Sequence, residues 1–274
     1  MVALAAVLVT QLLVAVAVLR APQPLPATPA APPAPPPVSS GQREVTLINL
    51  GGAATDPLMR RVTTELDGAV DAVEAFWGTD WPHEILVVAT GTDAEFSQQA
   101  AGVTDTVHIA AVTVADEVDT AEGAVTGQRI VFAPGAVAMT PGALRIVLTH
   151  ELFHYAARAG TATDAPRWLT EGVADYVARP WVPDGRSQPL PQALPSDGDF
   201  AVGEPQLSQA YDRAWWFARY VADAYGPPAL RALYVRAAGP GHTDAVTAMR
   251  EVLGADEPAV LAGWQEWLRR NGLA

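Results

Sequence analysis

The hydrophobic positions along the chain change their spacing near residue 140. Before that point, short apolar runs rich in β-branched residues predict strands at 45–50, 84–90, 107–114 and 129–134. One helix is predicted among them, from Asp56 to Trp77, with an apolar stripe formed by Leu58, Val62, Leu66, Val70 and Val73. Beyond Pro141, helical spacing predicts helices at 142–158, 166–178, 205–225, 227–238, 242–253 and 256–270. This order predicts an α+β fold, in which a small N-terminal β-rich part precedes a helical part, with a cleft between them.

The first twenty residues differ from the rest of the chain. Val2 to Leu19 are apolar except for Thr10 and Gln11, and these eighteen residues are at the lower edge of the length that spans a bilayer. We therefore expect residues 1–20 to be a membrane anchor or a signal segment. No basic region precedes the apolar run, as a signal peptide would require, so the anchor is favoured. A buried core helix is a further alternative.

Residues 21–42 are a linker rich in proline and alanine. Such a sequence packs neither as a helix nor as a central strand, and it favours an extended polyproline conformation. At about 3.1 Å per residue, its Pro/Ala tract reaches roughly 60 Å. We therefore predict a folded domain at 43–274 that is displayed away from a membrane surface. The expected location is extracytoplasmic and membrane-anchored, or secreted if the N-terminal segment is cleaved.

Charge and cysteine content exclude several classes of function. The chain has 17 basic and 30 acidic residues, a formal net charge of −13, and no run of basic residues, so nucleic acid is not an expected partner. It contains no cysteine, which excludes disulfides, cysteine-ligated zinc and thiol nucleophiles.

The strongest chemical pattern is His150-Glu151-Leu152-Phe153-His154. On a helix, residues four apart lie on one face, so both imidazoles can reach one metal ion. Glu151 lies about 100° round the helix, where it can act as a general base on a water molecule rather than as a ligand. Five residues with three specified also occur on ordinary helices, so the pattern needs support from elsewhere in the chain.

That support comes from Pro-Arg-Trp-Leu-Thr-Glu-Gly-Val-Ala-Asp-Tyr-Val, residues 166–177. A catalytic zinc ion usually keeps three protein ligands and one open position, and Glu171 can supply the third ligand. Asp175 lies four residues later on the same helix face, where it can accept the remaining N–H of a ligand imidazole. The alternative is a solvated acidic face of the helix.

The two segments together resemble the gluzincin clan of zinc peptidases, which includes thermolysin and the M1 family of aminopeptidases, and especially the bacterial proteins labelled peptidase MA-like. The similar region covers about 129–176, and more loosely extends to 226. The resemblance implies a zincin-like catalytic subdomain, Zn²⁺ as the cofactor and a peptide or protein substrate. The implied ligands are His150, His154 and Glu171. The metzincin pattern fails, because Ala157 and Gly160 stand where it requires glycine and histidine.

The segment 209–226 is similar to the helix of M1-type enzymes that opens with a tyrosine. The resemblance implies that Tyr211 donates a hydrogen bond to the oxyanion of the tetrahedral intermediate. The alternative is a packing role beside the neighbouring aromatic residues. The exopeptidase pattern Gly-x-Met-Glu-Asn, whose glutamate binds the substrate amino terminus, is absent, and the segment 133–142 has no acidic residue. Aminopeptidase specificity is therefore not expected.

We thus predict a zinc metallopeptidase with Glu151 and Tyr211 as catalytic residues. Two alternatives remain open: a zinc hydrolase of another amide or cell-wall component, and a non-catalytic binding module on a peptidase scaffold. The three isolated histidines, His83, His108 and His242, are expected to be structural or exposed. The strand around His108 is expected to border the cleft, where it could pair with an extended peptide.

Overall fold

The computed structural model of the protein describes residues 38–40, 43–100, 109–181, 189–201, 203 and 206–273. The predicted N-terminal segment at 1–20, nearly all of the linker at 21–42, and His108 lie outside this part of the chain. Across the described ranges, no helix is both long enough and apolar enough to cross a membrane.

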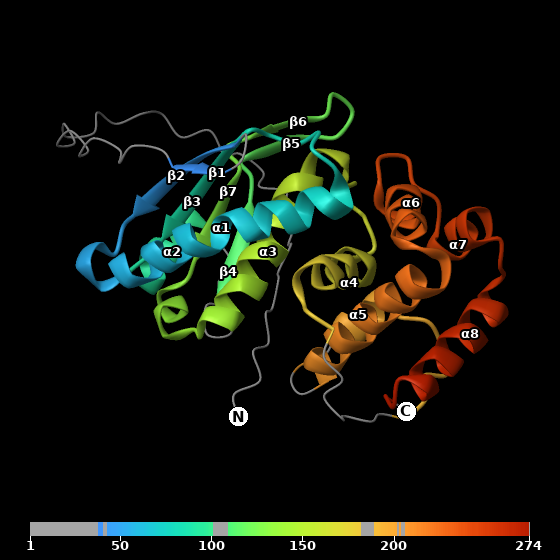
Figure 1. Ribbon diagram of the computed structural model, residues 1–274. Coiled ribbons are helices and arrows are strands. Elements are labelled where there is room, and N and C mark those ends of the chain that lie inside the picture. Colours follow the sequence, from blue (N-terminus) through green and yellow to red (C-terminus); the bar gives the residue numbers. More distant parts are fainter. Residues whose placement is uncertain are drawn as a thin grey trace.

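A five-stranded mixed sheet forms the N-terminal half of the fold (Figure 1). Its strand order is β1-β2-β3-β7-β4, with β2, β3 and β7 parallel and the two outer strands antiparallel to their neighbours. The strand bounds are β1 Val38–Ser40, β2 Arg43–Asn49, β3 Glu84–Ala89, β4 Ala111–Val114 and β7 Arg129–Phe132. A separate hairpin joins β5 (Glu117–Asp119) to β6 (Ala124–Thr126). Strand β4 is therefore an edge of the sheet.

Helices make up most of the remainder. Their bounds are α1 Asp56–Trp77, α2 Asp93–Gln99, α3 Pro141–Ala157, α4 Arg167–Ala178, α5 Gln206–Tyr225, α6 Pro227–Ala238, α7 Ala245–Leu253 and α8 Glu257–Arg270. Short 3₁₀ helices occupy η1 Gly52–Ala54, η2 Pro134–Ala138, η3 Arg158–Gly160 and η4 Asp197–Phe200. The α+β prediction is confirmed, and the predicted long helices begin and end within a few residues of the observed ones.

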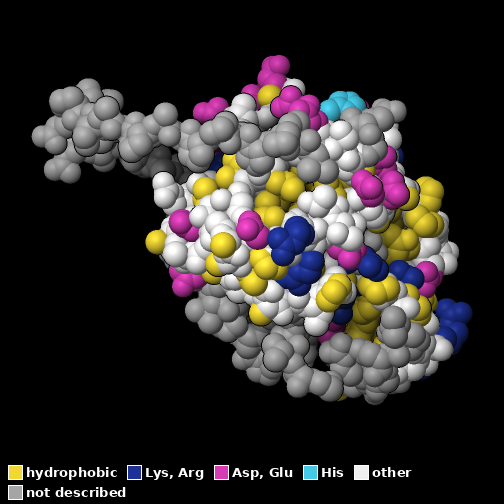
Figure 2. Space-filling view, turned by 60° about the vertical axis from the view of Figure 1, so that its left-hand side comes forward, with side chains coloured by type: hydrophobic (Ala, Val, Ile, Leu, Met, Phe, Trp, Pro, Cys, Tyr) yellow, Lys and Arg dark blue, Asp and Glu magenta, His cyan; other side chains and the backbone are white. Residues whose placement is uncertain are grey.

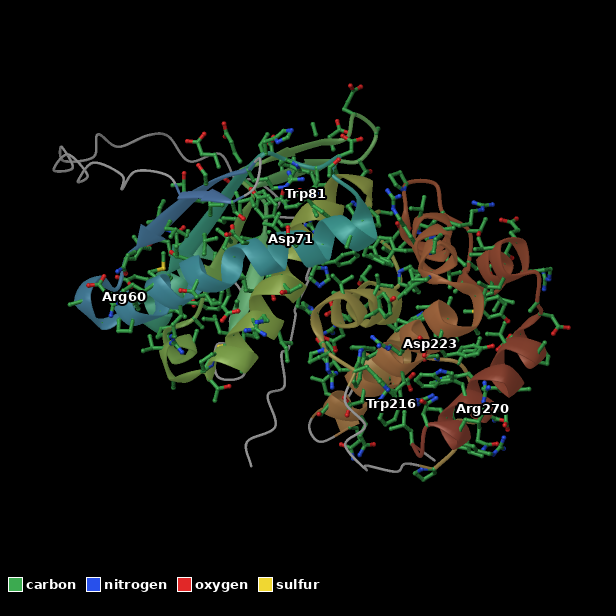
Figure 3. The ribbon with its side chains drawn as sticks, in the orientation of Figure 1. Arg60, Asp71, Trp81, Trp216, Asp223 and Arg270 are labelled. Carbon is green, nitrogen blue, oxygen red and sulfur yellow. The ribbon has the colours of Figure 1, made fainter. Side chains whose placement is uncertain are left out.

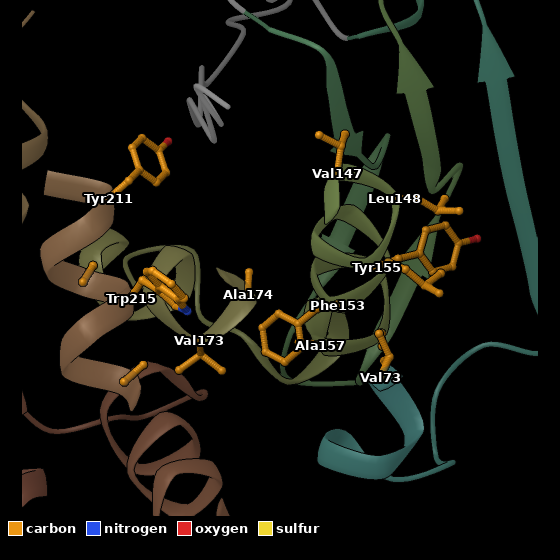
Figure 4. Close-up of a cluster of buried hydrophobic side chains, with 14 of the residues drawn as sticks. Val73, Val147, Leu148, Phe153, Tyr155, Ala157, Val173, Ala174, Tyr211 and Trp215 are labelled. Carbon is orange, nitrogen blue, oxygen red and sulfur yellow. The ribbon is translucent and has the colours of Figure 1, made fainter. Parts of the chain in front are cut away.

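Helix α3 lies in the middle of the molecule. Thr140 caps its first turn by accepting a hydrogen bond from the Ala143 amide, and Pro141 occupies the first turn, where a missing N–H costs nothing. Figure 4 shows Leu148 and Tyr155 pointing from α3 toward the strands, and Phe153 pointing the other way, toward α4. A helix that is apolar on several faces must be buried on all of them. Polar groups on α3 are therefore held inside the protein.

Helices α4 to α8 form the C-terminal half (Figure 1). Helix α4 packs closely on α5, because Gly172 has no side chain: a Cβ atom there would lie 2.6 Å from the Ala214 carbonyl oxygen. Helix α8 is fastened to α5 by the Trp267 indole, which donates a hydrogen bond to Asp223 at 3.1 Å (Figure 3 labels Asp223). These contacts join α4, α5 and α8, and α4 also packs directly on α3.

Some details differ from the sequence prediction. Helix α2 was not predicted, although Thr92 and Glu95 form a capping box at its start. The polar, glycine-containing stretch between the predicted strands 107–114 and 129–134 forms the β5–β6 hairpin. Helix α7 begins at Ala245 rather than at residue 242, because Asp244 caps it by accepting from the Thr247 amide. Helices α1 and α3 also pack against each other beside the sheet, so the N-terminal half contains the helix that carries both histidines of the motif.

Charged side chains are interspersed on the surface. On the face shown in Figure 2, basic side chains form small separate groups among hydrophobic and acidic ones. That nucleic acid is not a partner stays a prediction.

Candidate metal centre

The two histidines of the motif share one face of α3. Their Nε2 atoms are 3.1 Å apart and their ring centroids 4.8 Å apart. His150 is only 2% exposed, whereas His154 is partly exposed. The i, i+4 spacing therefore brings the two imidazoles together, as the sequence predicted.

Helix α4 supplies the third group. Glu171 Oε2 lies 3.3 Å from His150 Nε2 and 3.8 Å from His154 Nε2. Ligands bonded to tetrahedral zinc at about 2.0–2.1 Å would be separated by about 3.3 Å. The three separations of 3.1, 3.3 and 3.8 Å are close to that value. His150, His154 and Glu171 form a buried group that could hold a metal ion.

The surroundings of Glu171 fit a bound cation. The residue is fully buried, and neither of its carboxylate oxygens accepts a hydrogen bond from the described residues. A buried carboxylate without hydrogen bonds is costly unless a positive charge faces it. Burial raises the pKa of Glu171, but the imidazoles of His150 and His154 outweigh this and hold the pKa at about 2. Glu171 is therefore ionised and could serve as an oxygen ligand.

Asp175 orients one of the histidines. Its Oδ1 lies 2.9 Å from His150 Nδ1, so the imidazole can donate from Nδ1 and present the Nε2 lone pair to a metal ion. Burial raises the pKa of Asp175, but the hydrogen bond with His150 and the charge of Arg179 lower it below its usual range. The structure thus brings Asp175 to the place that the sequence predicted for it.

A buried network that the sequence analysis missed supports Asp175. Arg179 donates to Asp175 Oδ2 at 3.0 Å and to Asp212 Oδ1 at 2.9 Å, and its guanidinium lies 3.9 Å from the centroid of the Trp215 ring. The i, i+4 spacing of Asp175 and Arg179 on α4 was a signal for the first contact. No comparable signal indicated Asp212, which belongs to another helix.

The two histidines have opposite pKa shifts. Burial lowers the pKa of His150, but Asp175 and Glu171 outweigh it and raise the pKa to about 10. Burial lowers the pKa of His154, and Glu171 offsets only part of that effect. Without a metal ion, His150 is therefore the histidine of the pair that becomes positively charged, because it lies between the carboxylates of Asp175 and Glu171. A metal ion bound by the two imidazoles and Glu171 would compensate the same negative charges.

Glu151 faces the edge of the sheet and is not part of the cluster of ligand atoms. Its Oε2 lies 2.9 Å from the Thr113 hydroxyl on β4, and that hydroxyl is also 2.8 Å from the Glu151 carbonyl oxygen. Burial raises the pKa of Glu151 to about 8, although the charge of His150 and the Thr113 hydrogen bond act in the opposite direction. Thr113, which the sequence analysis did not identify, therefore positions this carboxyl group.

Tyr211 lies near the start of α5. Figure 4 shows its ring projecting from α5 in the direction of α3. Its hydroxyl accepts a hydrogen bond from Arg167 at 3.1 Å, and its ring packs edge-on against Phe200, with ring centroids 4.9 Å apart. Arg167 also lines the cavity beside His154, so the contact links Tyr211 to the surroundings of the metal centre. Its part in catalysis stays a prediction.

The two other histidines that the structure describes are separate from this cluster. His83 is exposed, and His242 lies 3.3 Å from the exposed carboxylate of Asp164. Neither belongs to a group of possible metal ligands among the described residues.

The chain matches no protein-family model, and no curated protein matches it. What can be said of its chemistry therefore depends on its own residues and their arrangement.

Proposed function

We propose that this protein is a zinc-dependent peptide hydrolase of the gluzincin type. The observation that carries the proposal is the placement of two imidazoles and one carboxylate at separations near those of tetrahedral zinc ligands. Beside them, Glu151 contacts Thr113 and is not among the ligand atoms. A purely structural metal site would normally have four protein ligands and would need no such carboxylate.

The donor set favours zinc. Two neutral imidazole nitrogens and one carboxylate oxygen suit zinc, whereas calcium and magnesium prefer all-oxygen sites. When bound, zinc lowers the pKa of a coordinated water and polarises a carbonyl group. His150, His154 and Glu171 would hold the ion, and Asp175 fixes the orientation of His150 through the 2.9 Å contact.

Glu151 has the position of a general base. It accepts a proton from the attacking water and returns that proton to the leaving amine. The Thr113 hydroxyl anchors Oε2, which leaves Oε1 for proton transfer. Tyr211 is the proposed hydrogen-bond donor to the carbonyl oxygen that becomes negatively charged.

We propose that the substrate backbone binds along strand β4. It is an edge strand, and its Thr113 both lines the cavity beside His154 and contacts Glu151. An extended peptide can add to such an edge through main-chain hydrogen bonds. That arrangement favours cleavage within a peptide, and the segment 133–142 offers no carboxylate to bind a free amino terminus.

The proposed location is outside the cytoplasm, with the domain held at a membrane by residues 1–20 or released from it by cleavage. The apolar run from Val2 to Leu19 and the Pro/Ala-rich linker that follows it support this proposal.

Replacing Glu151 by glutamine separates the base from the ligands. Glu151→Gln keeps the shape of the side chain but cannot accept a proton, so zinc should remain bound while cleavage of an N-acetylated peptide falls by orders of magnitude. Zinc content and peptide cleavage are measured on the same full-length preparation. Glu122→Gln, at an exposed position in the β5–β6 turn, is the matched control and should change neither. Loss of zinc in Glu151→Gln would contradict the assignment of the base.

A further inference from the structure

A cavity of about 100 Å³ opens beside the metal centre. Its wall includes His154 from the centre and Thr113 from β4, and it extends to Tyr234 on α6. An engineered cavity of about 150 Å³ in another protein holds benzene, so this one has room for a small side-chain group. The cavity is therefore placed to receive a part of the substrate close to the bond that is cleaved.

The charge of this cavity differs from that of the chain. The formal net charge of the protein is −13, yet the cavity is lined by two arginines, Arg158 and Arg167, and by no acidic residue among the described ones. Four threonines also line it: Thr113, Thr161, Thr163 and Thr170. The hydroxyls of Thr113, Thr161 and Thr170 already donate hydrogen bonds within the protein. The guanidinium groups are therefore the main donors for a carboxylate in this cavity.

The two arginines have different surroundings. Arg167 donates to the Tyr211 hydroxyl, and its guanidinium lies 5.1 Å from the centroid of the Phe200 ring. Arg158, four residues after His154, has a buried Nε, and its side chain makes no hydrogen bond or ion pair within the described ranges. A guanidinium that is partly withdrawn from water without an opposite charge is unfavourable. A carboxylate entering the cavity would supply that charge.

We propose that this cavity, the Arg158 pocket, binds a carboxylate group of the substrate next to the cleaved bond. The proposal rests on the proposed peptide hydrolysis and names its substrate class: peptides with an acidic side chain, or with a C-terminal carboxylate, at that position. Arg158 is the specificity-determining residue, because its guanidinium can form two parallel hydrogen bonds with a carboxylate.

The test uses the zinc-bound full-length chain and three N-acetylated peptides of otherwise identical sequence. The first has a glutamate at the variable position and an amidated C-terminus, and the second has glutamine there. The third ends at the variable position, with glutamine as its last residue and a free C-terminal carboxylate. Cleavage rates are measured by mass spectrometry, and binding to the non-cleaving Glu151→Gln chain by calorimetry. We expect the glutamate or the free-carboxylate peptide to be preferred over the amidated glutamine peptide by roughly 10-fold to 100-fold.

Three variants locate the cause of that preference. Arg158→Gln should abolish it, and Arg158→Lys should retain part of it, because lysine keeps the charge but not the paired donors. Arg145→Gln is the control: it removes an arginine charge from α3, the helix that precedes Arg158, where the exposed guanidinium pairs with Glu65 at 2.6 Å, and the preference should persist. If Arg158→Gln does not fold, the preference of the wild-type chain among the three peptides, and its reduction in Arg158→Lys, still test the proposal.

The two proposals fail in different ways. Cleavage of all three peptides at equal rates, or a preference that survives in Arg158→Gln, would overturn the Arg158 pocket and leave peptide hydrolysis standing. Absence of cleavage, with an Arg158-dependent binding preference for a carboxylate, would support the pocket and contradict peptide hydrolysis. Equal binding of the three peptides without cleavage would overturn both.

Discussion

Glu171 and Glu151 show how two carboxyl groups of one site acquire different chemical states. Both are buried, but Glu171 faces the imidazoles of His150 and His154, whereas Glu151 faces the neutral hydroxyl of Thr113. Burial raises the pKa of both groups, but the imidazoles hold that of Glu171 at about 2, whereas that of Glu151 stays at about 8. Pairs of titratable groups that differ in this way commonly divide into a charged partner and a proton carrier.

The members of the candidate metal centre could be predicted from the sequence because the spacing within each of the two helices is local. His150 and His154 are four residues apart on one helix, as are Glu171 and Asp175 on the next. Other contacts depend on tertiary structure. Thr113 reaches Glu151 from a strand 38 residues earlier in the chain, and Asp212 reaches Arg179 from a helix 33 residues later. No periodicity in the sequence indicates such pairs.

At this scale we predict that Asp175→Asn weakens zinc binding about 10-fold to 100-fold. The amide cannot supply the negative charge that stabilises the His150 hydrogen bond, and it also loses its ion pair with Arg179. Zinc affinity is measured by competition with a chelator. Asp71→Asn, at an exposed position on α1, serves as the control. Unchanged affinity in Asp175→Asn would show that Asp175 does not orient the ligand.

Helices α3 and α4 turn the two local patterns into one site. Helix α3 is held between the sheet and α4, and α4 is held against α5 by the close approach at Gly172 (Figure 4). Long helices such as α1 were predictable because each has a continuous hydrophobic stripe, whereas α3 is apolar on several faces. Helix α2 and the β5–β6 hairpin are too short for periodicity to reveal, and caps and turns define them instead.

The α4–α5 contact leads to a stability prediction. Gly172→Ala would place a Cβ atom 2.6 Å from the Ala214 carbonyl oxygen, so the helices must separate, at a cost of about 1–3 kcal/mol. Gly142→Ala is the matched control, because nothing lies within 4 Å of the added Cβ atom in the first turn of α3. That variant should be neutral or more stable by about 0.4–1 kcal/mol. Denaturant unfolding measures both, and equal effects would contradict the packing argument.

At the scale of the whole molecule, the candidate site lies where the two halves of the fold meet. Helix α3 and strand β4 supply Glu151 and its partner Thr113, and the helical half supplies Glu171 and Asp175. The sequence predicted such a cleft from the order of strands and helices. The cavity with Arg158 could not be predicted in the same way, because its wall is assembled from β4, β5, α3, η3, the segment 161–165, α4 and α6.

This arrangement predicts cleavage within peptides. An aminoacyl reporter with a free amine needs a carboxylate to bind its ammonium group, whereas an N-acetylated peptide needs the open edge of β4. We expect turnover of the acetylated peptide and little or none of the reporter. Rates on the two substrates are compared with the same zinc-bound preparation. Strong turnover of the reporter alone would show that the protein is an exopeptidase.

The zinc content of the purified full-length chain tests the central claim most directly. Metal analysis of wild type, His154→Ala and His242→Ala is made after identical dialysis, since His242 lies outside the ligand cluster and controls for loss of any imidazole. We predict about one zinc ion per chain in wild type and in His242→Ala, and loss of most of it in His154→Ala, which removes one of three ligands. Full zinc occupancy in His154→Ala, or no zinc retained by the wild-type chain, would contradict the metal centre described for His150, His154 and Glu171.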